Sequence, residues 1–317
     1  MNRGESYRLA WDDVCFTTAY APQLFSGEFL FQSQLAGRRA CTMRSLDVNN
    51  IAIKEELGKG GFGSVFLAKH GSCDIVLKKM MRTPSHRLEG VAKREYDLSS
   101  RLKHPNLVRM RHSFDTQTDH CLVMDVVEGI DLFRFMEAHD FSPIDEILFR
   151  KAFKGLCKGL EHSHTKGVAH LDIKPENIMV GDGGHLTLID FGLATDSINC
   201  SSYRGSPEYA APEVWRRTPY NPFCADVWSL GVVLYVGLTG CSPFAEDCAA
   251  STMTQTPKLE WPIELDISMR VKELVQWMME YRPEDRPTVK DILNHKWLMK
   301  KSLLARISPR LTRKNQA

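Results

Sequence analysis

The chain has 317 residues, of which 43% are apolar and 25% charged, a composition typical of folded globular proteins and unlike that of disordered or collagen-like chains. Its 41 Lys and Arg against 39 Asp and Glu give a net charge of +2, which argues against a dedicated nucleic-acid binder. The charge is unevenly spread, because residues 292–317 carry seven bases and no acid. Residues 1–291 therefore hold 34 bases against 39 acids, a charge of −5, and we expect no specific nucleic-acid partner for them.

Cysteines and apolar runs bear on the compartment of the protein. Nine cysteines are scattered along the chain without a C-x-x-C pair, which predicts free thiols in a reducing compartment rather than a disulfide framework or a zinc site. The longest strongly apolar run, residues 230–238, is too short to span a bilayer. The first residues mix both charge signs and lack the apolar core of a secretory signal. We expect a cytoplasmic protein without a transmembrane segment, with the nucleus as an alternative compartment.

Residues 1–50 show no sustained periodicity and are expected to form an extension of uncertain order. From residue 51 the runs IAIKEEL, SVFLAKH and DIVLKKM predict short strands. The first two flank Gly58-Lys59-Gly60-Gly61-Phe62-Gly63-Ser64-Val65, in which glycines let backbone N–H groups approach a phosphate. A dinucleotide-binding turn would lead into a helix, but here a strand follows. We therefore expect a hairpin that covers a nucleotide, with a plain Gly-rich hairpin as the alternative.

A lysine and a glutamate form the second candidate pair. Lys78 ends a predicted strand, thirteen residues after Val65. The next segment has the period of a helix, and Glu95 occupies a position on its apolar stripe, which consists of Leu88, Val91, Leu98 and Leu102. A buried carboxylate is costly unless a cation pairs with it, so we expect Glu95 to meet Lys78 on the neighbouring sheet. Lys79 is the alternative partner, and a Glu95 that reaches solvent is the alternative to a pair.

The remainder of the body is predicted to be mainly helical. The run HCLVMDVV predicts a buried strand, and beyond Gly129 helical periods dominate. Two apolar stripes mark long helices, one with Phe149, Phe153, Leu156 and Leu160 and the other with Val271, Leu274, Val275 and Met278. A smaller strand-rich half thus precedes a larger helical half, and the two join near residues 126–129.

The most specific motif is His170-Leu171-Asp172-Ile173-Lys174-Pro175-Glu176-Asn177, followed thirteen residues later by Asp190-Phe191-Gly192. Two carboxylates, an amide and a lysine recur within 21 residues. Phosphoryl transfer needs such a set, because a carboxylate must orient the acceptor hydroxyl and oxygen ligands must hold Mg²⁺. The run HLTLIDFG places Asp190 at the end of an apolar strand, which is a suitable position for a metal ligand.

The chain resembles the eukaryotic protein kinases of the serine/threonine type over residues 51–298. The motifs occur in the order of that family: GKGGFGSV, the strand lysine, the helix glutamate, HLDIKPEN, DFG and Ala211-Pro212-Glu213, with Arg286 as the expected partner of Glu213. The resemblance implies an α+β bilobal kinase fold, with a small mainly β N-lobe that carries one regulatory helix and a larger mainly α C-lobe. The expected boundaries are about 51–124 for the N-lobe, 125–128 for the hinge and 129–298 for the C-lobe, followed by a basic tail at 299–317.

The resemblance also implies an ATP site. The glycine hairpin would cover the phosphates, Lys78 would hold them with Glu95 as its orienting partner, and the backbone of Asp125-Val126-Val127 would bind adenine. Met124 stands at the gatekeeper position, and Asp131 stands where the family contacts ribose or a substrate arginine. The full expected set is Leu57, Gly58, Lys59, Gly60, Gly61, Phe62, Gly63, Ser64, Val65, Val76, Lys78, Glu95, Met124, Asp125, Val127 and Asp131.

Four residues are expected to carry the transfer. Asp172 would take the proton of the substrate hydroxyl, and Lys174 would neutralise charge on the γ-phosphate. Asn177 and Asp190 would ligate Mg²⁺, with Mn²⁺ as an alternative ion. Lys174 together with Ser206 matches the serine/threonine pattern. A kinase-fold scaffold with weak or no activity is the competing interpretation, and the complete catalytic set argues against it.

Leu171 departs from the family pattern, because an arginine usually precedes the catalytic aspartate and pairs with a phosphorylated activation loop. We expect that basal activity does not require phosphorylation within residues 190–213, with Arg204 as an alternative base for a phosphate.

Leu171 and the short spacing from Val65 to Lys78 resemble the Mos group, germ-cell kinases that start a mitogen-activated kinase cascade. The stretches KPEN, GSPEYAAPEV, DVWSLGVVLY and ILNHKWL resemble the calmodulin-dependent kinases instead, and both alternatives stay open.

Two regions bear on partners. Asp131 and Glu176 stand where basophilic kinases bind arginines upstream of the acceptor residue, so we expect protein substrates with an upstream Arg. The alternative is that both acids are solvated and have no role in substrate binding. The tail 297–317 alternates apolar residues with bases, which suits calmodulin or an anionic surface. Pro309 would interrupt a continuous helix there, and a plain solvated tail is the alternative.

Overall fold

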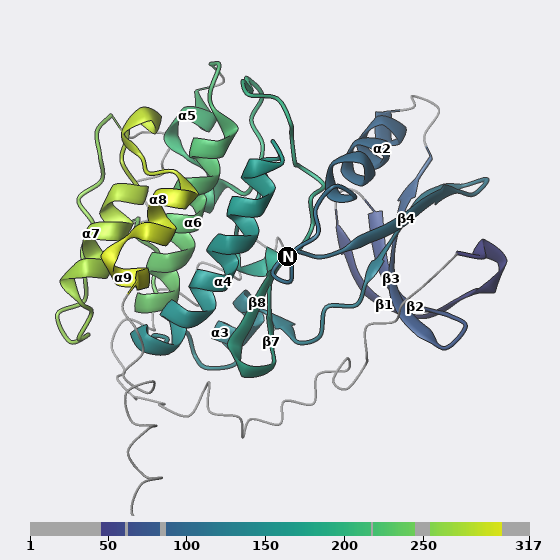
Figure 1. The fold of residues 1–317 in the computed structure, drawn as a ribbon, viewed down its shortest axis with the longest axis horizontal. Helices are drawn as coiled ribbons and strands as arrows, with labels where there is room; N and C mark the ends of the chain where they lie inside the picture. The colour runs from purple at the N-terminus through teal and green to yellow at the C-terminus, as the bar shows by residue number, and fades with distance from the viewer. Residues whose placement is uncertain (1–45, 61–62, 83–86, 217, 245–253, 300–317) are drawn as a thin grey trace, which may run out of the picture.

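The structure is a computed structural model, and it describes residues 46–60, 63–82, 87–216, 218–244 and 254–299. Two groups of elements lie side by side (Figure 1). One is an antiparallel sheet with strand order β1-β2-β3-β5-β4 and a single helix, α2; the other is helical and contains a small sheet of order β6-β7-β8. The expected α+β architecture is therefore confirmed, with a smaller, mainly β lobe that carries one helix and a larger, mainly α lobe.

The N-lobe sheet consists of β1 (Ile51–Gly60), β2 (Gly63–His70), β3 (Cys73–Met81), β4 (Met110–Asp115) and β5 (Asp119–Asp125). Side chains alternate between its two faces, so neighbours along a strand point in opposite directions. On one face Met80 and Leu122 pack with Ala92 of α2 (Arg87–Ser99). On the other face Leu77 and Val123 form a separate cluster. The helix thus covers one face of the sheet, and residues of even number in β3 point towards it.

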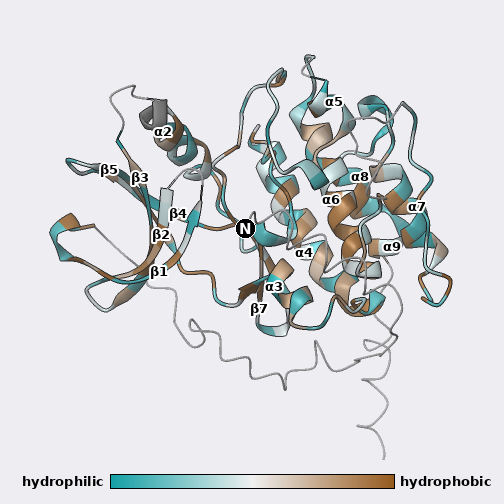
Figure 2. Cartoon of the chain, turned by 180° about the vertical axis from the view of Figure 1, so that it is seen from behind, coloured by the Kyte–Doolittle hydropathy of each residue, from teal (hydrophilic) through white to brown (hydrophobic). Residues whose placement is uncertain are grey.

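The C-lobe is built around two long helices, α4 (Glu146–Thr165) and α6 (Pro222–Thr239). Shorter elements surround them, namely β6 (Ile130–Asp131), α3 (Leu132–Glu137), β7 (Ile178–Gly181), β8 (His185–Leu188), α5 (Pro212–Trp215), α7 (Met269–Met278), α8 (Val289–Asn294) and α9 (Lys296–Met299). Figure 2 shows the apolar character of α6, which lies among the other helices. By length and composition α6 could cross a membrane, but 89% of it is buried inside the fold, as in the core helix of a folded domain.

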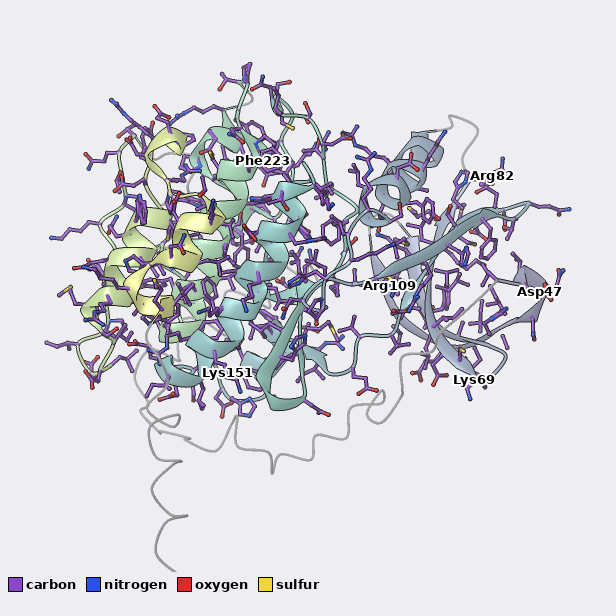
Figure 3. The ribbon with its side chains drawn as sticks, in the orientation of Figure 1. Asp47, Lys69, Arg82, Arg109, Lys151 and Phe223 are labelled. Carbon is purple, nitrogen blue, oxygen red and sulfur yellow. The ribbon has the colours of Figure 1, made fainter. Side chains whose placement is uncertain are left out.

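Both predicted apolar stripes lie in the C-lobe core. The four stripe residues of α4 and the four of α7 are fully buried. Just before β4, the Arg109 carbonyl accepts a hydrogen bond from the Asp125 N–H over 3.0 Å, which extends the β4–β5 pairing (Figure 3 labels Arg109). The neighbouring Val108 N–H donates to the Leu188 carbonyl of β8 over 2.9 Å, which joins this segment to the C-lobe. The chain then runs through residues 126–129 into β6, so the hinge follows directly on β5.

The described cysteines differ in part from expectation. Cys121, Cys157, Cys200, Cys224 and Cys241 are free thiols, as the scattered pattern predicts. Cys73 is disulfide-bonded in the structure, so the expectation of thiols alone was wrong at this position. The spacing of the cysteines carried no signal for it, because disulfide pairing depends on which side chains the fold brings together.

Candidate active site

The glycine hairpin is formed by β1 and β2. Their antiparallel register pairs Gly58 with Val65 and Gly60 with Gly63, so the two strands run to the turn as expected. Gly63 has a φ of +140°, and a Cβ there would overlap the Lys79 carbonyl, which explains the need for glycine. Gly61 and Phe62 lie outside the described residues.

Lys78 forms the buried ion pair that the sequence predicts. Its Nζ donates to both carboxylate oxygens of Glu95 over 2.9 Å, and both residues are almost fully buried. The same Nζ donates to Oδ1 of Asp190 over 2.8 Å. Lys79 points to the opposite face of the sheet, where its Nζ lies 3.2 Å from Oδ2 of Asp119. The alternation of the strand therefore excludes Lys79 as the partner of Glu95.

Charge favours the ionised state of Lys78 and Asp190, whereas burial raises the pKa of Glu95 above its ordinary value in spite of the Lys78 ammonium. Burial lowers the pKa of Lys78, but the charges of Glu95 and Asp190 outweigh it and hold that pKa well above its ordinary value. Burial also works to raise the pKa of Asp190, yet the Lys78 ammonium and its hydrogen bond lower it overall. A Cβ on Gly192 would lie 3.1 Å from Oδ1 of Asp190 and 3.2 Å from Nζ of Lys78. Glycine at this position leaves room for the triad.

Asp172 is held by residues from two segments. Its Oδ1 accepts hydrogen bonds from the Ser206 N–H over 3.0 Å and from the Ser206 hydroxyl over 2.9 Å. Its Oδ2 accepts from Nδ2 of Asn177 over 2.9 Å. Lys174 donates to the Ser206 hydroxyl over 2.6 Å and lies 3.3 Å from the Asp172 carboxylate. The structure thus brings Asp172, Lys174 and Asn177 together, and it adds Ser206 as the link between them.

Asp226 anchors the backbone of this loop, and its role was not foreseen from the sequence. Its side chain is fully buried in α6 and accepts from the N–H of His170 over 2.8 Å and from the N–H of Leu171 over 2.7 Å. Leu171 has a φ of +63°, a strained conformation that these bonds help to hold. The sequence did contain a signal for this role, because Asp226 stands in an otherwise apolar helix. A carboxylate buried there needs hydrogen-bond partners, which is the reasoning that identified Glu95.

The hinge and its neighbours line the remaining part of the site. Met124 is half-buried and pairs with Val76 across the sheet. The Asp125 carboxylate points to Arg111, with two hydrogen bonds of 2.6 and 2.7 Å, and its N–H donates to the Arg109 carbonyl, so neither group is free to face a ligand. Among the described residues, the peptide groups of 126–128 form no backbone hydrogen bond. They are thus available to a planar ligand with donors and acceptors on one edge.

Asp131 performs a structural task that the sequence analysis did not foresee. Its carboxylate caps α3 by accepting from the Arg134 N–H over 2.8 Å, and it also lies 3.4 Å from Nε of Arg134. Glu176, the other acid considered for substrate arginines, is exposed. The protein atoms around its carboxyl group still exclude part of the solvent, and this desolvation raises the pKa of Glu176 above its ordinary value.

Asn177 and Asp190 offer a suitable donor set for a hard divalent cation. Nδ2 of Asn177 donates its hydrogen bonds to Asp172, which leaves the amide oxygen of Asn177 to bind a cation. The Asp190 side chain is 43% exposed and, within the described ranges, its Oδ2 has no hydrogen-bond partner. Carboxylate and amide oxygens are the ligands that Mg²⁺ and Mn²⁺ accept. No group of three or more His, Cys, Asp or Glu gathers elsewhere in the described part of the chain.

The glycine hairpin, the buried lysine–glutamate pair and the Asp172 loop between two lobes define a phosphotransferase of the kinase class. The family model "Protein kinase domain" matches residues 51–298, so the chain belongs to the protein kinase family. Its relatives are serine/threonine kinases, and the chain is a protein serine/threonine kinase that uses ATP and a divalent metal ion.

Three relatives show the range of the similarity. Aurora kinase of Dictyostelium discoideum is 30% identical over 259 residues, which cover 80% of this chain and 67% of the relative. Myosin light chain kinase family member 4 of Homo sapiens is 32% identical over 266 residues, 80% of this chain and 68% of the relative. The calcium/calmodulin-dependent protein kinase type II alpha chain of Drosophila melanogaster is 31% identical over 294 residues, 86% of this chain and 53% of the relative.

Proposed function

We propose that Asp172 is the catalytic base of this kinase and that it acts on serine and threonine hydroxyls of protein substrates. The observation that carries the proposal is the fixed Asp172 carboxylate, whose two oxygens are oriented by Ser206 and Asn177. An acceptor hydroxyl placed beside this carboxylate would transfer its proton to it as the oxygen attacks the γ-phosphorus of ATP, and the bond from that phosphorus to the bridging oxygen would break to release ADP. Lys174, which reaches both Asp172 and Ser206, balances the charge that develops on the transferred group.

The other residues would hold the nucleotide. Lys78 binds its phosphates, the hairpin Gly58–Gly63 covers them, and the backbone of Asp125 and Val127 binds adenine. Asn177 and Asp190 would hold Mg²⁺, with Mn²⁺ as the alternative, and the ion supplies charge neutralisation at the phosphates. Leu57, Val65, Val76 and Met124 would form the apolar walls of the adenine site.

Radiolabelled phosphate transfer from ATP to a mixed protein substrate tests these roles. Asp172→Asn and Asp190→Asn should each lower the rate at least about 100-fold. Lys79→Met is the matched control for Lys78→Met, because the two lysines are neighbours on one strand and point to opposite faces. Phosphoamino acid analysis should find phosphoserine and phosphothreonine. Wild-type protein no more active than Asp190→Asn would overturn the proposal, as would phosphotyrosine as the main product.

We also propose a basophilic substrate preference of the calmodulin-dependent kinase type. The exposed carboxylate of Glu176, next to the catalytic loop, supports it, and so does the similarity to a calcium/calmodulin-dependent protein kinase. A peptide library should select arginine upstream of the acceptor, and Glu176→Gln should weaken that selection about tenfold. A library without upstream arginine would contradict the proposal. Efficient activation of a mitogen-activated kinase kinase would favour the Mos-like alternative.

We extend the proposal to the partners of the tail 299–317 and to the location of the protein in the cell. Residues 300–317 of this tail lie outside the described residues, and the bases and apolar residues of the tail suit calmodulin or an anionic surface. Full-length protein should bind calmodulin in a calcium-dependent way, and the double substitution Arg306→Glu/Arg310→Glu should abolish binding. Binding to anionic vesicles and not to calmodulin would identify an anionic surface as the partner.

We propose that the protein is located in the cytoplasm, with the nucleus as the alternative. Imaging of the tagged chain distinguishes the two.

A further inference from the structure

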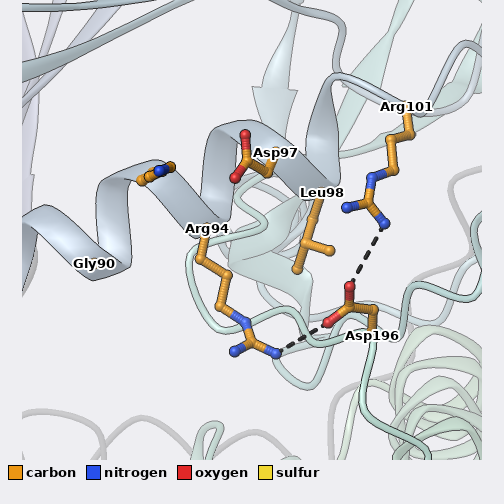
Figure 4. A pocket seen from close by; sticks show the side chains of 7 residues that line it. Gly90, Arg94, Asp97, Leu98, Arg101 and Asp196 are labelled. Carbon is orange, nitrogen blue, oxygen red and sulfur yellow. Dashed lines mark hydrogen bonds and ion pairs between the residues drawn. The ribbon is translucent and has the colours of Figure 1, made fainter.

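An ion-pair cluster joins helix α2 to the activation segment, which we define as residues 190–213. Nη2 of Arg94 lies 3.2 Å from Oδ1 of Asp196, and Nη1 of Arg101 lies 3.5 Å from Oδ2 of the same carboxylate. Figure 4 shows the two guanidinium groups reaching Asp196 from both sides of a small cavity under α2. One carboxylate therefore holds two cations of the N-lobe with its two oxygens.

Helix α2 carries both this cluster and the glutamate of the active site. Glu95 directly follows Arg94, so the turn of helix that presents Arg94 to Asp196 also places Glu95 against Lys78. Arg101 lies two residues beyond the end of α2, so the Asp196 carboxylate contacts the helix at Arg94 and the turn that follows it at Arg101. A movement of α2 away from the activation segment would break both ion pairs and withdraw Glu95.

The other side of the cluster is fixed to the catalytic loop. Thr195 is fully buried, and its hydroxyl accepts from Nη2 of Arg94 over 3.0 Å. Its backbone forms a pair of hydrogen bonds of 2.9 Å with Ala169, three residues before Asp172. Asp196 is therefore held at a fixed place relative to the catalytic loop, and α2 is docked against that place.

The negative charge in this arrangement comes from a carboxylate. The Leu171 side chain is buried in the C-lobe core and brings no positive charge to the activation segment. Arg204, the alternative base, donates to the Leu193 carbonyl and to the Ser202 hydroxyl, both within the same segment. The charge that faces α2 is thus the permanent carboxylate of Asp196.

We propose that Asp196, Arg94 and Arg101 are positioning residues that keep α2, and through it the Lys78–Glu95 pair, in the active arrangement without phosphorylation of the activation segment. The inference rests on the proposed function, because it concerns the same site. The three side chains are 45–49% exposed, so each pair contributes modestly and is weakened by salt. We expect effects of several-fold rather than complete loss of activity.

Two readouts test the proposal on the full chain. Asp196→Asn should lower kcat/KM about three- to tenfold and speed hydrogen exchange in residues 91–99, with little change in Tm. Asp97→Asn is the matched control, because it removes the same charge from α2 on the side that faces away from Asp196 (Figure 4). The wild-type rate should fall as NaCl rises from 0.05 to 0.5 M, and the Asp196→Asn rate should be much less sensitive. Equal exchange and equal rates in Asp196→Asn and wild type would overturn the proposal.

Charge reversal separates an electrostatic role from a merely structural one. Arg94→Glu/Arg101→Glu should lose at least tenfold in kcat/KM, since like charges then surround Asp196. Adding Asp196→Arg to this double variant places one positive charge between two negative ones, which is the wild-type arrangement with all signs reversed. The triple variant should therefore return the rate to within about threefold of wild type. A triple variant as inactive as the double would overturn the proposal.

Phosphatase treatment completes the test. The treated wild-type enzyme should keep at least half its rate, and a loss above fivefold would overturn the proposal. Hydrogen exchange does not depend on phosphate transfer. A wild type without transfer would therefore count against the proposed function alone, while the exchange of residues 91–99 would still decide the role of Asp196.

Discussion

Nζ of Lys78 lies 2.9 Å from both carboxylate oxygens of Glu95, and this contact joins the N-lobe sheet to its only described helix at the centre of the active site. It exists because even-numbered residues of β3 face α2, while Lys79 faces Asp119 on the other side. The third partner, Asp190, ties the same ammonium to the C-lobe. The active arrangement of the two lobes thus depends on one buried cation.

Loss of that cation should be costly in stability as well as in activity. Lys78→Met leaves two carboxylates near one another without a counter-charge and should lower the free energy of unfolding by about 3 kcal/mol. Lys79→Met removes a partly exposed pair and should lower it by less than about 1 kcal/mol. Chemical denaturation of both variants measures the difference. Equal losses would contradict the assignment of Lys78 as the buried partner.

Gly192 provides a steric test of the same cluster. A methyl group there would lie 3.1–3.4 Å from atoms of Asp190, Lys78 and Glu95, so Gly192→Ala should lower kcat about tenfold by displacing them. Gly90→Ala is the control, because a Cβ at this helical position meets nothing within 4 Å. The control should stabilise α2 by about 0.5–1 kcal/mol and leave activity unchanged. Steady-state kinetics that show no loss in Gly192→Ala would refute the crowding argument.

Ser206 should matter through Asp172. Ser206→Ala removes the hydroxyl that bridges Lys174 and Asp172, and we expect kcat to fall about 10- to 100-fold with little change in KM for ATP. Ser202→Ala, in the same segment but without contact to Asp172, serves as the comparison. A fall in ATP affinity alone would show that Ser206 acts on the nucleotide and not on the base.

The pH dependence of the free energy of unfolding at low pH should reveal the contribution of Asp190. The pKa of Asp190 in the folded state lies below its ordinary value of 3.8, so its contribution to stability is present above that value and is lost as pH falls through the lower, folded pKa. The difference in unfolding free energy between wild type and Asp190→Asn should therefore be constant from pH 5 to 7 and change only below about pH 4. A difference that changes between pH 5 and 7 would contradict this.

The pair Arg286–Glu213 links the activation segment to the C-lobe core. Two hydrogen bonds of 2.7 and 2.8 Å join the groups, and the Arg286 side chain is fully buried. Arg286→Met should lower the free energy of unfolding by about 3–5 kcal/mol, because it leaves a buried carboxylate without a partner. The double variant Arg286→Met/Glu213→Leu should lose less than the single one. A larger loss in the double variant would mean that packing and not charge dominates there.

Several parts of the site followed from local pattern alone. Glu95 on an apolar stripe was expected to pair with a lysine, because a buried charge demands a counter-charge wherever the fold places it. The pair of Glu213 with Arg286 was expected from the resemblance to the protein kinases and not from local pattern. The glycine hairpin followed from the strand on each side of the turn. Asp226 was missed although the same reasoning applies to it. Asp131 was considered only for ligands, since its position three residues before Arg134 did not by itself distinguish a helix cap from a binding residue.

Local sequence determined the strands, the helices and the chemical types needed for phosphoryl transfer, because periodicity and residue type are properties of short segments. The tertiary structure decided which of two adjacent lysines meets Glu95, that Ser206 rather than solvent holds Asp172, and that Asp196 meets Arg94 across 102 residues of chain. These contacts join separate segments of the chain, and the contact of Asp196 with Arg94 also joins the two lobes. Their distances depend on how sheet, helix and activation segment pack, and no short window of sequence contains that information.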